Sequence, residues 1–595
     1  MHYKNDSGKK KGNKMYIEKI NSPEDVRQLS VQQLNTLSQE LRAALVKKLS
    51  EHGGHIGPNL GMVETTVAMH YVFNSPTDKF VFDVSHQSYV HKMLTGRMDA
   101  FLQPAKYDDV TGFSNPEESE HDFFTIGHTS TSVSLATGLA KGRDLNGGKE
   151  NIVAVIGDGS LSGGEALEGL NNAAVLGSNL IIVVNDNDQS IAENHGGIYK
   201  GLKELRGTDG KSPNNLFKAM GLEYHYLEDG HDVAKLVELF QSVKDTDHAV
   251  VLHIHTIKGK GLDYAEKNKE YWHAGGPFNP EDGSPKGPGW PVNETVRDAI
   301  MELIEERKDV VAITAGTPAV MGFTEELRKK AGRQFVDVGI AEEHAVAMAS
   351  GIARNGGTPI FGVFSPFLQR TYDQLSSDLC LNNNPAVILV SLASVYGMNS
   401  NTHLGIYDIP MISHIPNLVY LAPASKEEYL AMFRYATTQK SHPVAIRIPV
   451  MMPETGIEDL TDYSVLNKFQ VVREGSDVAV IALGDFFGLG VQVVDEYKKL
   501  TGKSLTLINP KFVTGLDEEL LESLKVSHKL VITLEDGIVE GGFGQTVAGF
   551  YGLSGMKVKN YGVRKSFPTD FNPVELLDEN GISVEKIIGD IRSNL

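Results

Sequence analysis

Runs of apolar residues alternate with amphipathic segments along most of the chain. Residues 152–156 and 180–184 are apolar runs rich in Val and Ile, and such runs fit strands that are buried on both faces of a parallel sheet. Between them, residues 162–176 carry apolar side chains at helical spacing, among them Ala166 and Leu170. The order strand, helix, strand predicts a right-handed crossover unit whose two strands lie close together in one sheet.

The same alternation recurs before and after this unit. Ser22-Pro23 is typical of a helix start, and leucines at helical spacing follow it as far as the breaker Gly53-Gly54. Residues 478–481, 505–508 and 530–534 are strand-like, and a turn or helix signal follows each of them. Alternation throughout predicts an α/β protein made of three doubly wound, mostly parallel-sheet domains.

Changes in composition suggest where these domains meet. Residues 1–14 are basic and polar without an apolar core, so we interpret them as a disordered extension and not as a secretory signal. The first domain is expected at 15–283, and a linker rich in Pro and Gly at 284–297. The second and third domains are expected at 298–454 and 465–595.

Overall composition restricts the class of protein. With 595 residues the chain is too long for one core, and its 41% hydrophobic and 22% charged residues are ordinary for a globular protein. A net charge of -20 disfavours nucleic acid as a partner. Cys380 is the only cysteine, which excludes an internal disulfide and fits a cytoplasmic protein. No apolar run approaches the length of a membrane span.

Polar clusters close the two strands of the crossover unit. Gly157-Asp158-Gly159 ends the first run, and Asn185-Asp186-Asn187 ends the second. Their side chains should face one crevice, because the carboxyl ends of neighbouring parallel strands share a sheet edge. Mg²⁺ prefers oxygen ligands, which Asp158 and Asn187 can supply, and glycines let a backbone approach phosphates. Gly-Asp-Gly is also ordinary turn chemistry, but the strand context on both sides favours a metal-diphosphate cradle.

This pattern resembles the thiamine-diphosphate signature of transketolase-like enzymes. The resemblance implies a transketolase-like architecture for the three domains. It also implies that Asp158, Asn187 and the backbone carbonyl of Gln189 hold Mg²⁺. The segment DVGIAEEHAVAMASGIARNG at 337–356 runs from strand to helix and is similar to the glutamate motif of the same enzymes. A glutamate at a helix start is ordinarily a solvated charge, whereas the resemblance implies that Glu342 protonates N1′ of the cofactor's aminopyrimidine ring.

More specific segments resemble the 1-deoxy-D-xylulose-5-phosphate synthase family over nearly the whole chain from Met15. They are INSPEDVRQLS at the start, the long segment from Gly53 to Arg97, IGHTSTSVS from Ile126, FLQRTYDQ from Phe367 and THLGIYD from Thr402. The resemblance implies a homodimer that uses thiamine diphosphate and Mg²⁺ to decarboxylate pyruvate. It also implies transfer of the two-carbon unit to an aldehyde, D-glyceraldehyde 3-phosphate, in isoprenoid and thiamine biosynthesis.

The resemblance assigns roles to individual residues. His55 and His86 would lie at the reacting end of the cofactor, and Arg370 and His403 would meet substrate. The residues that would bind the cofactor are His86, Gly127, His128, Thr129, Asp158, Gly159, Ser160, Asn187, Lys258, Glu342 and Phe367, with His273 as a further candidate. Without the resemblance, histidines on interior loops are more often structural, and Thr129, Ser130 and Ser132 are typical of turns and helix caps.

The chain departs from the family's pattern where the acceptor phosphate is bound. There the family has two arginines and a tyrosine, whereas this chain has Leu392, Val450 and Phe364. An acidic residue of the family is replaced by Asn399, and the segment after Asn187 is shorter. Arginine binds phosphate with two parallel charge-assisted hydrogen bonds, so the exchange removes the strongest contacts to a dianion.

These observations leave other activities open. One alternative is a paralogue that forms a 1-deoxyketose from a different aldehyde, without a phosphate. Another is an E1-type 2-oxo acid dehydrogenase component, which the fused order of segments disfavours. A regulator that only binds the cofactor would be expected to lack Glu342 or the cradle, and the sequence has both.

Overall fold

The computed structural model describes residues 15–287 and 293–595. The predictions for residues 1–14, and for residues 288–292 of the expected linker, lie outside the described residues. The chain divides into two compact units, residues 1–291 and residues 292–595. Each unit is described by itself.

Unit 1 is built on a five-stranded parallel sheet with strand order β1-β2-β3-β5-β4. The strands are β1 (Lys79–Phe82), β2 (Ile152–Gly157), β3 (Leu180–Asp186), β4 (Glu223–Leu227) and β5 (Ala249–His255). All seven residues of β3 are buried. The predicted strands at 152–156 and 180–184 are therefore β2 and β3, and they are direct neighbours as expected.

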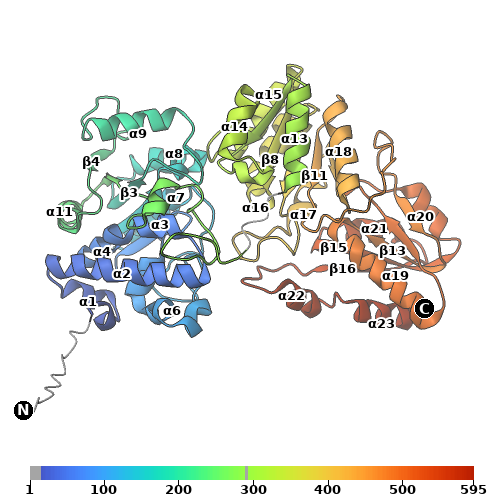
Figure 1. Ribbon diagram of the computed structural model, residues 1–595, viewed down its shortest axis with the longest axis horizontal. Coiled ribbons are helices and arrows are strands. Elements are labelled where there is room, and N and C mark those ends of the chain that lie inside the picture. The colour runs from blue at the N-terminus through green and yellow to red at the C-terminus, as the bar shows by residue number, and fades with distance from the viewer. Residues whose placement is uncertain (1–14, 288–292) are drawn as a thin grey trace, which may run out of the picture. The chain divides into compact units, whose positions relative to one another are not determined.

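Helices cover both faces of this sheet (Figure 1). Val153 and Val155 of β2 enter one core with α2 and α4, while Ile152 and Ala154 enter the opposite core with α7 and α8. Successive side chains of a strand point to opposite faces, so a run without polar residues fits only a sheet covered twice. The helices are α1 (Pro23–Arg27), α2 (Val31–His52), α3 (Ile56–Gly61), α4 (Val63–Val72), α5 (Tyr89–Lys92), α6 (Asp99–Leu102), α7 (Ser132–Leu145), α8 (Gly164–Ala173), α9 (Gly197–Gly207), α10 (Leu216–Ala219), α11 (Val233–Val243) and α12 (Asp263–Lys267).

One helix boundary differs from the prediction. The helix expected at 162–176 is α8, which covers only residues 164–173, and a separate 3₁₀ turn, η4 (Gly159–Ser162), precedes it. Gly163 between them has the extended conformation, with φ -72° and ψ 140°. The spacing of apolar residues does not predict where the helix begins. The extended backbone at Gly163 sets that boundary.

Unit 2 contains a six-stranded parallel sheet with strand order β10-β11-β9-β8-β6-β7. Its strands are β6 (Val310–Thr314), β7 (Phe335–Asp337), β8 (Thr358–Phe364), β9 (Val387–Ser391), β10 (Val419–Leu421) and β11 (Val444–Arg447). Its helices are α13 (Glu294–Glu306), α14 (Glu325–Ala331), α15 (Glu342–Arg354), α16 (Ser365–Leu368), α17 (Asp408–Ile412) and α18 (Lys426–Thr438). Residues of α13 and α18 pack into the core on one face of this sheet. Residues of α15 and α17 pack into the core on the other face.

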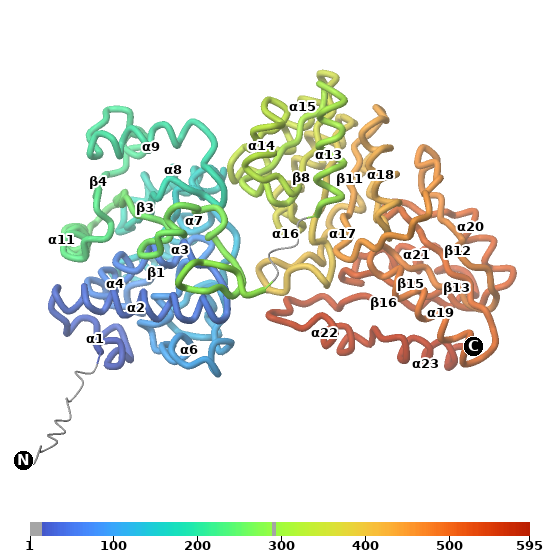
Figure 2. The backbone as a smooth tube through the Cα atoms, viewed as in Figure 1, coloured from blue at the N-terminus to red at the C-terminus, as the bar shows by residue number. Residues whose placement is uncertain are grey.

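The third sheet also belongs to unit 2 and has the order β12-β14-β13-β15-β16. Its strands are β12 (Gln470–Arg473), β13 (Asp477–Ala482), β14 (Thr506–Asn509), β15 (His528–Ile538) and β16 (Lys557–Val563), and Figure 2 shows β12, β13, β15 and β16 in the orange to red part of the chain. Only the pair β12 and β14 is antiparallel. The helices are α19 (Phe487–Thr501), α20 (Glu518–Leu524), α21 (Phe543–Tyr551), α22 (Pro573–Glu579) and α23 (Val584–Asn594). The predicted class, α/β with three mostly parallel sheets, is confirmed.

Within the described ranges, every helix is too short or too polar to cross a bilayer.

Candidate cofactor and catalytic site

The carboxyl ends of β2 and β3 bring Asp158 and Asn187 to the same edge of the unit 1 sheet. Gly157 pairs with Asn185 in the register of the two strands. The backbone N–H of Gln189 donates a hydrogen bond of 3.1 Å to Oδ2 of Asp158. The three residues expected to hold a metal therefore lie together.

The chemistry of this edge fits a divalent cation. Asn187 is buried, and its Oδ1 accepts no hydrogen bond from any described residue. Burial, and then the neighbouring charge of Asp186, raise the pKa of Asp158 to about 7. A buried amide oxygen without a donor beside a buried carboxylate is costly unless a cation or water joins them. Residues 15–287 and 293–595 contain no cluster of three His, Cys, Asp or Glu side chains that could hold a metal. A metal here would therefore depend on amide and peptide oxygens beside one carboxylate.

Gly159 is required by close packing. A Cβ atom at this position would lie 2.8 Å from Oγ and 3.1 Å from Cα of Ser190. The hydroxyl of Tyr199 donates to the carbonyl of Gly159 at 3.1 Å. The turn that follows Asp158 is thus fixed from two directions, with its backbone close to the loop after β3.

A second turn at this edge holds residues 127–132. Asp83, which directly follows β1, accepts hydrogen bonds from the backbone N–H groups of Ser130 at 2.8 Å and Ser132 at 2.9 Å. The hydroxyl of Ser130 donates to the carbonyl of Ser160 at 2.8 Å. These bonds place Gly127, His128 and Thr129 on the turn beside the Ser160 loop. Asp83 was not among the predicted site residues, although it is a polar residue that closes a buried strand.

Three histidines of unit 1 form one cluster. The ring centroid of His55 lies 5.0 Å from that of His86 and 5.8 Å from that of His273, and the centroids of His86 and His273 are 5.2 Å apart. Nδ2 of Asn59 donates to the carbonyls of His55 at 2.8 Å and His86 at 2.7 Å, so this buried amide joins the two segments. Burial lowers the pKa of His55 to about 4, so the ring is neutral near pH 7.

Lys258 connects this cluster to the cradle. Its Nζ donates to the carbonyl of Ser190 at 2.5 Å and lies 3.0 Å from Nδ1 of His273. Burial lowers the pKa of Lys258 to about 7. A Cβ at Gly57 would lie 3.1 Å from Cγ of Lys258, so the lysine stem fits closely against α3.

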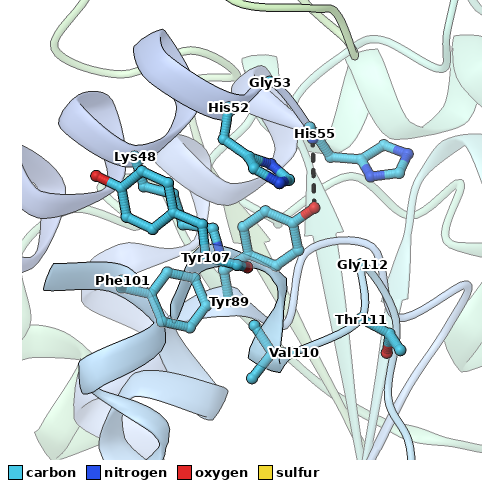
Figure 3. A pocket seen from close by; sticks show the side chains of 11 residues that line it. Lys48, His52, Gly53, His55, Tyr89, Phe101, Tyr107, Val110, Thr111 and Gly112 are labelled. Atoms are coloured by element: carbon cyan, nitrogen blue, oxygen red, sulfur yellow. Dashed lines mark hydrogen bonds between the residues drawn. The ribbon is translucent and has the colours of Figure 1, made fainter. Parts of the chain in front are cut away.

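A cavity of about 240 Å³ lies behind His55. Its walls include the aromatic rings of Tyr89, Phe101 and Tyr107 (Figure 3). The hydroxyl of Tyr89 accepts a long hydrogen bond of 3.5 Å from the backbone N–H of His55, and in Figure 3 the His55 ring points away from these aromatic rings. The cavity therefore contacts the backbone of His55, while its ring belongs to the histidine cluster.

Unit 2 contains the predicted catalytic carboxyl. Glu342 is the first residue of α15 and is 3% exposed, so it is not a solvated helix-start charge. Its Oε2 accepts no hydrogen bond from a described residue, and the nearest cation, Nη1 of Arg370, is 3.9 Å away. Burial raises the pKa of Glu342 to about 7, although Arg370 acts in the opposite direction. This carboxyl can therefore exchange a proton near neutral pH.

The other site residues predicted in unit 2 lie on segments that follow β8 and β9. Phe367 is on α16, and the following turn carries Arg370. The Phe367 ring is 5.6 Å from the ring of His403, and Oγ1 of Thr402 lies 2.9 Å from Nδ1 of that histidine. Glu342 and Arg370 thus form one pair, and Phe367 and His403 another.

The three positions that depart from the family's pattern lie at the carboxyl ends of neighbouring strands. Phe364 ends β8, Leu392 directly follows β9, and Val450 lies shortly after β11. The backbone N–H groups of Val450 and Met451 donate to the carboxylate of Asp485 at 3.0 and 3.1 Å. This edge therefore presents apolar side chains, with a carboxylate against its backbone.

Comparison with known proteins agrees with this architecture. Residues 17–212 and 208–256 match the family model described as 1-deoxy-D-xylulose-5-phosphate synthase. Residues 290–453 match the transketolase pyrimidine-binding domain, and residues 467–587 match the transketolase C-terminal domain.

Curated relatives match over almost their whole length. The 1-deoxy-D-xylulose-5-phosphate synthase of Carboxydothermus hydrogenoformans is 38% identical, covering 96% of this chain and 98% of that protein. The synthase of Lachnoclostridium phytofermentans is 36% identical, covering 97% and 98%. A solved transketolase from Campylobacter jejuni is 17% identical and covers 95% of this chain and 100% of its own, with a TM-score of 0.43.

The three sheets and the domain matches define a transketolase-like enzyme. Because the relatives exceed a third of identical positions over nearly the full chain, the protein belongs to the 1-deoxy-D-xylulose-5-phosphate synthase family.

Proposed function

We propose that this protein is a thiamine-diphosphate-dependent transferase that condenses pyruvate with an aldehyde. The nominal acceptor is D-glyceraldehyde 3-phosphate. Pyruvate, the aldehyde and one proton give 1-deoxy-D-xylulose 5-phosphate and CO₂. The observation that carries the proposal is Glu342, a buried carboxyl at a helix start with its pKa raised to about 7.

The residues of unit 1 are proposed to bind the diphosphate end of the cofactor. Asp158, Asn187 and the carbonyl of Gln189 would hold Mg²⁺, and the turns at 127–129 and 159–160 would offer backbone N–H groups to phosphate oxygens. The unpartnered Oδ1 of Asn187 supports this assignment. Lys258, which is buried and lies near Asp158, would add a cation close to the phosphates.

Glu342 is proposed to donate a proton to N1′ of the aminopyrimidine ring. The cofactor, when bound, supplies an acidic C–H that adds to a ketone once deprotonated and then accepts the electron pair released with CO₂. A carboxyl with a pKa near 7 can lose and regain a proton at little cost at neutral pH. Phe367 would pack against the ring, and Arg370 would attract the carboxylate of pyruvate.

The neutral histidines are proposed to orient the reacting groups. His55, with its pKa near 4, is a neutral donor and acceptor that can hydrogen-bond a substrate oxygen without adding charge. His86 would act beside it, and His403 would contact the acceptor. Exclusion of water from this neutral, aromatic environment would protect the reacting carbon from protonation.

A second candidate function is condensation with a different, unphosphorylated aldehyde. The apolar strand edge formed by Phe364, Leu392 and Val450 supports it, since the carboxylate of Asp485 rather than a cation hydrogen-bonds the backbone there. A purified enzyme supplied with pyruvate and a panel of phosphorylated and unphosphorylated aldehydes, with products identified by mass, tests both candidates. Failure to release CO₂ from pyruvate with any aldehyde would reject both.

We also propose a cytoplasmic homodimer. The single cysteine supports a reducing compartment, and the family resemblance supports the dimer. Native mass spectrometry at low micromolar concentration tests the dimer directly, and a monomer at every concentration would reject it.

A further inference from the structure

The loop after β3 brings a residue outside the thiamine-diphosphate signature onto the proposed metal ligand. Asn194 lies between β3 and α9, and its Nδ2 donates a hydrogen bond of 2.6 Å to Oδ2 of Asp158. Gln189 donates its backbone N–H to the same oxygen at 3.1 Å, and the backbone N–H of Asn187 also bonds to this carboxylate. An oxygen that accepts two N–H donors is a poor cation ligand, so Oδ1 of Asp158 would be the better ligand for a cation.

The amide of Asn194 also has an unused acceptor. Its Oδ1 is buried and accepts no hydrogen bond from a described residue, as is true of Oδ1 of Asn187. Leaving a buried amide oxygen unpaired costs the hydrogen bonds that water makes to it in the unfolded chain. Two such oxygens beside one buried carboxylate indicate a shared partner that brings positive charge or donor hydrogens. A hydrated divalent cation has both.

The loop that carries Asn194 is held in place from both sides. On α9, Tyr199 donates its hydroxyl to the carbonyl of Gly159 at 3.1 Å. Near the end of the same helix, Arg206 bonds both oxygens of Asp186, at 2.7 and 2.6 Å. Asp186 in turn is bonded to the buried ring of His253 at 2.8 Å. The contact between Asn194 and Asp158 therefore belongs to an anchored element.

We propose that Asn194 is a further residue of the metal site: its Nδ2 fixes the orientation of Asp158, and its Oδ1 accepts a hydrogen bond from water on the bound cation. This inference rests on the proposed function, because it assumes that the cation binds at Asp158 and Asn187. Outer-shell partners of this kind change metal affinity about 10-fold to 100-fold when they are removed.

The test measures Mn²⁺ binding by electron paramagnetic resonance at saturating thiamine diphosphate, together with the rise in Tm on adding Mn²⁺. Asn194→Ala should raise the Kd for Mn²⁺ at least 10-fold and reduce the Tm rise. Asn194→Asp should have a lower Tm than wild type without metal, because two carboxylates then face each other, and a larger Tm rise with it. The control Asn172→Ala removes an exposed asparagine of α8 that bonds only the backbone of its own helix, and it should change neither readout.

The outcomes separate the role of Asn194 from the metal site of the proposed function. If wild type binds Mn²⁺ and Asn194→Ala binds it equally well with the same Tm rise, the role of Asn194 is overturned and the proposed function stands. If wild type binds no Mn²⁺ at all, the metal site itself is wrong. If Asn194→Ala does not fold, the Asp variant decides: a Tm rise no larger than that of wild type overturns the inference.

Discussion

Two sheets of this protein offer the same kind of edge and use it in opposite ways. In unit 1, β1, β2 and β3 are followed directly by Asp83, Asp158 and Asn187, which are buried. Hydrogen bonds connect Asp83 and Asp158 to the turns around them. In unit 2, the neighbouring strands β8, β9 and β11 lead into Phe364, Leu392 and Val450. The polar edge is proposed to bind a cation and phosphates, whereas Phe364, Leu392 and Val450 at the apolar edge carry no charge that could bind a dianion.

Under the proposed function, this difference separates cofactor chemistry from acceptor choice. The residues proposed to activate the cofactor include the buried Glu342. At the apolar edge the backbone itself is unusual: Leu392 has φ 55°, and a Cβ at Gly405 would lie 1.9 Å from the Leu392 carbonyl oxygen. The turn is therefore fixed, and a change of side chain at Leu392 alters its chemistry without requiring a new backbone.

The largest effect is expected at the polar edge. Asp158→Ala removes the only carboxylate among the proposed metal ligands and should weaken Mg²⁺-dependent binding of thiamine diphosphate by at least 100-fold, measured by calorimetry. The fold should persist, because removal of a buried charge offsets the loss of the hydrogen bonds that Gln189 and Asn194 donate to Asp158. Glu168→Ala, an exposed acidic residue of α8, is the control. Unchanged affinity in the Asp158 variant would remove the basis for the cradle.

Glu342→Gln should separate activation from binding. The variant keeps the size of the side chain but cannot supply the proton, so exchange of the cofactor's C2 proton, followed by NMR, should slow by about 10²–10⁴-fold. Affinity for the cofactor should stay within a few fold. Glu343→Gln, on the same helix, should exchange at the wild-type rate. If the C2 proton exchanges as fast in Glu342→Gln as in wild type, Glu342 does not activate the cofactor.

Arginines placed at the apolar edge should sharpen the comparison. Leu392→Arg with Val450→Arg should lower the KM for glyceraldehyde 3-phosphate about 10-fold or more, because each charge-assisted contact contributes about 1.5–3 kcal/mol. Asp485 beside Val450 will neutralise part of the new charge, so Leu392→Arg should contribute most. The matched pair Leu392→Gln with Val450→Gln adds length without charge. Equal KM changes for phosphorylated and unphosphorylated glyceraldehyde would show that the new groups do not meet the phosphate.

The last prediction is a dependence of stability on pH, which is measured as a shift in Tm. The pKa of Glu342 is about 7 in the folded protein and 4.5 as a reference, so ionisation destabilises the fold progressively as pH rises from 4.5 to 7. The penalty is complete above pH 7, at about 3 kcal/mol, and absent below pH 4.5. Glu342→Gln should therefore raise Tm at pH 8.5 and leave it nearly unchanged at pH 4.5. A Tm difference independent of pH would contradict the buried, titrating carboxyl.

The elements that could be predicted from the sequence are those with a pattern among neighbouring residues. β2, β3 and the polar clusters after them were visible because buried strands read as unbroken apolar runs. Asn59, Asp83 and Asn194 were missed, because each acts on residues far away in the chain: Asn59 on His86, Asp83 on Ser130, and Asn194 on Asp158. A contact between residues far apart in the chain cannot be predicted from the sequence around a single polar residue.

One competition assay tests the contrast between the two edges most directly. Wild-type enzyme receives pyruvate, Mg²⁺ and thiamine diphosphate with equal amounts of D-glyceraldehyde 3-phosphate and D-glyceraldehyde, and both products are quantified by mass with the CO₂ released. We expect CO₂ release that depends on the cofactor, and a preference for the phosphorylated aldehyde of less than about 10-fold, since Phe364, Leu392 and Val450 offer the dianion no charged side chain. A preference of several orders of magnitude for glyceraldehyde 3-phosphate, or no CO₂ release, would contradict it.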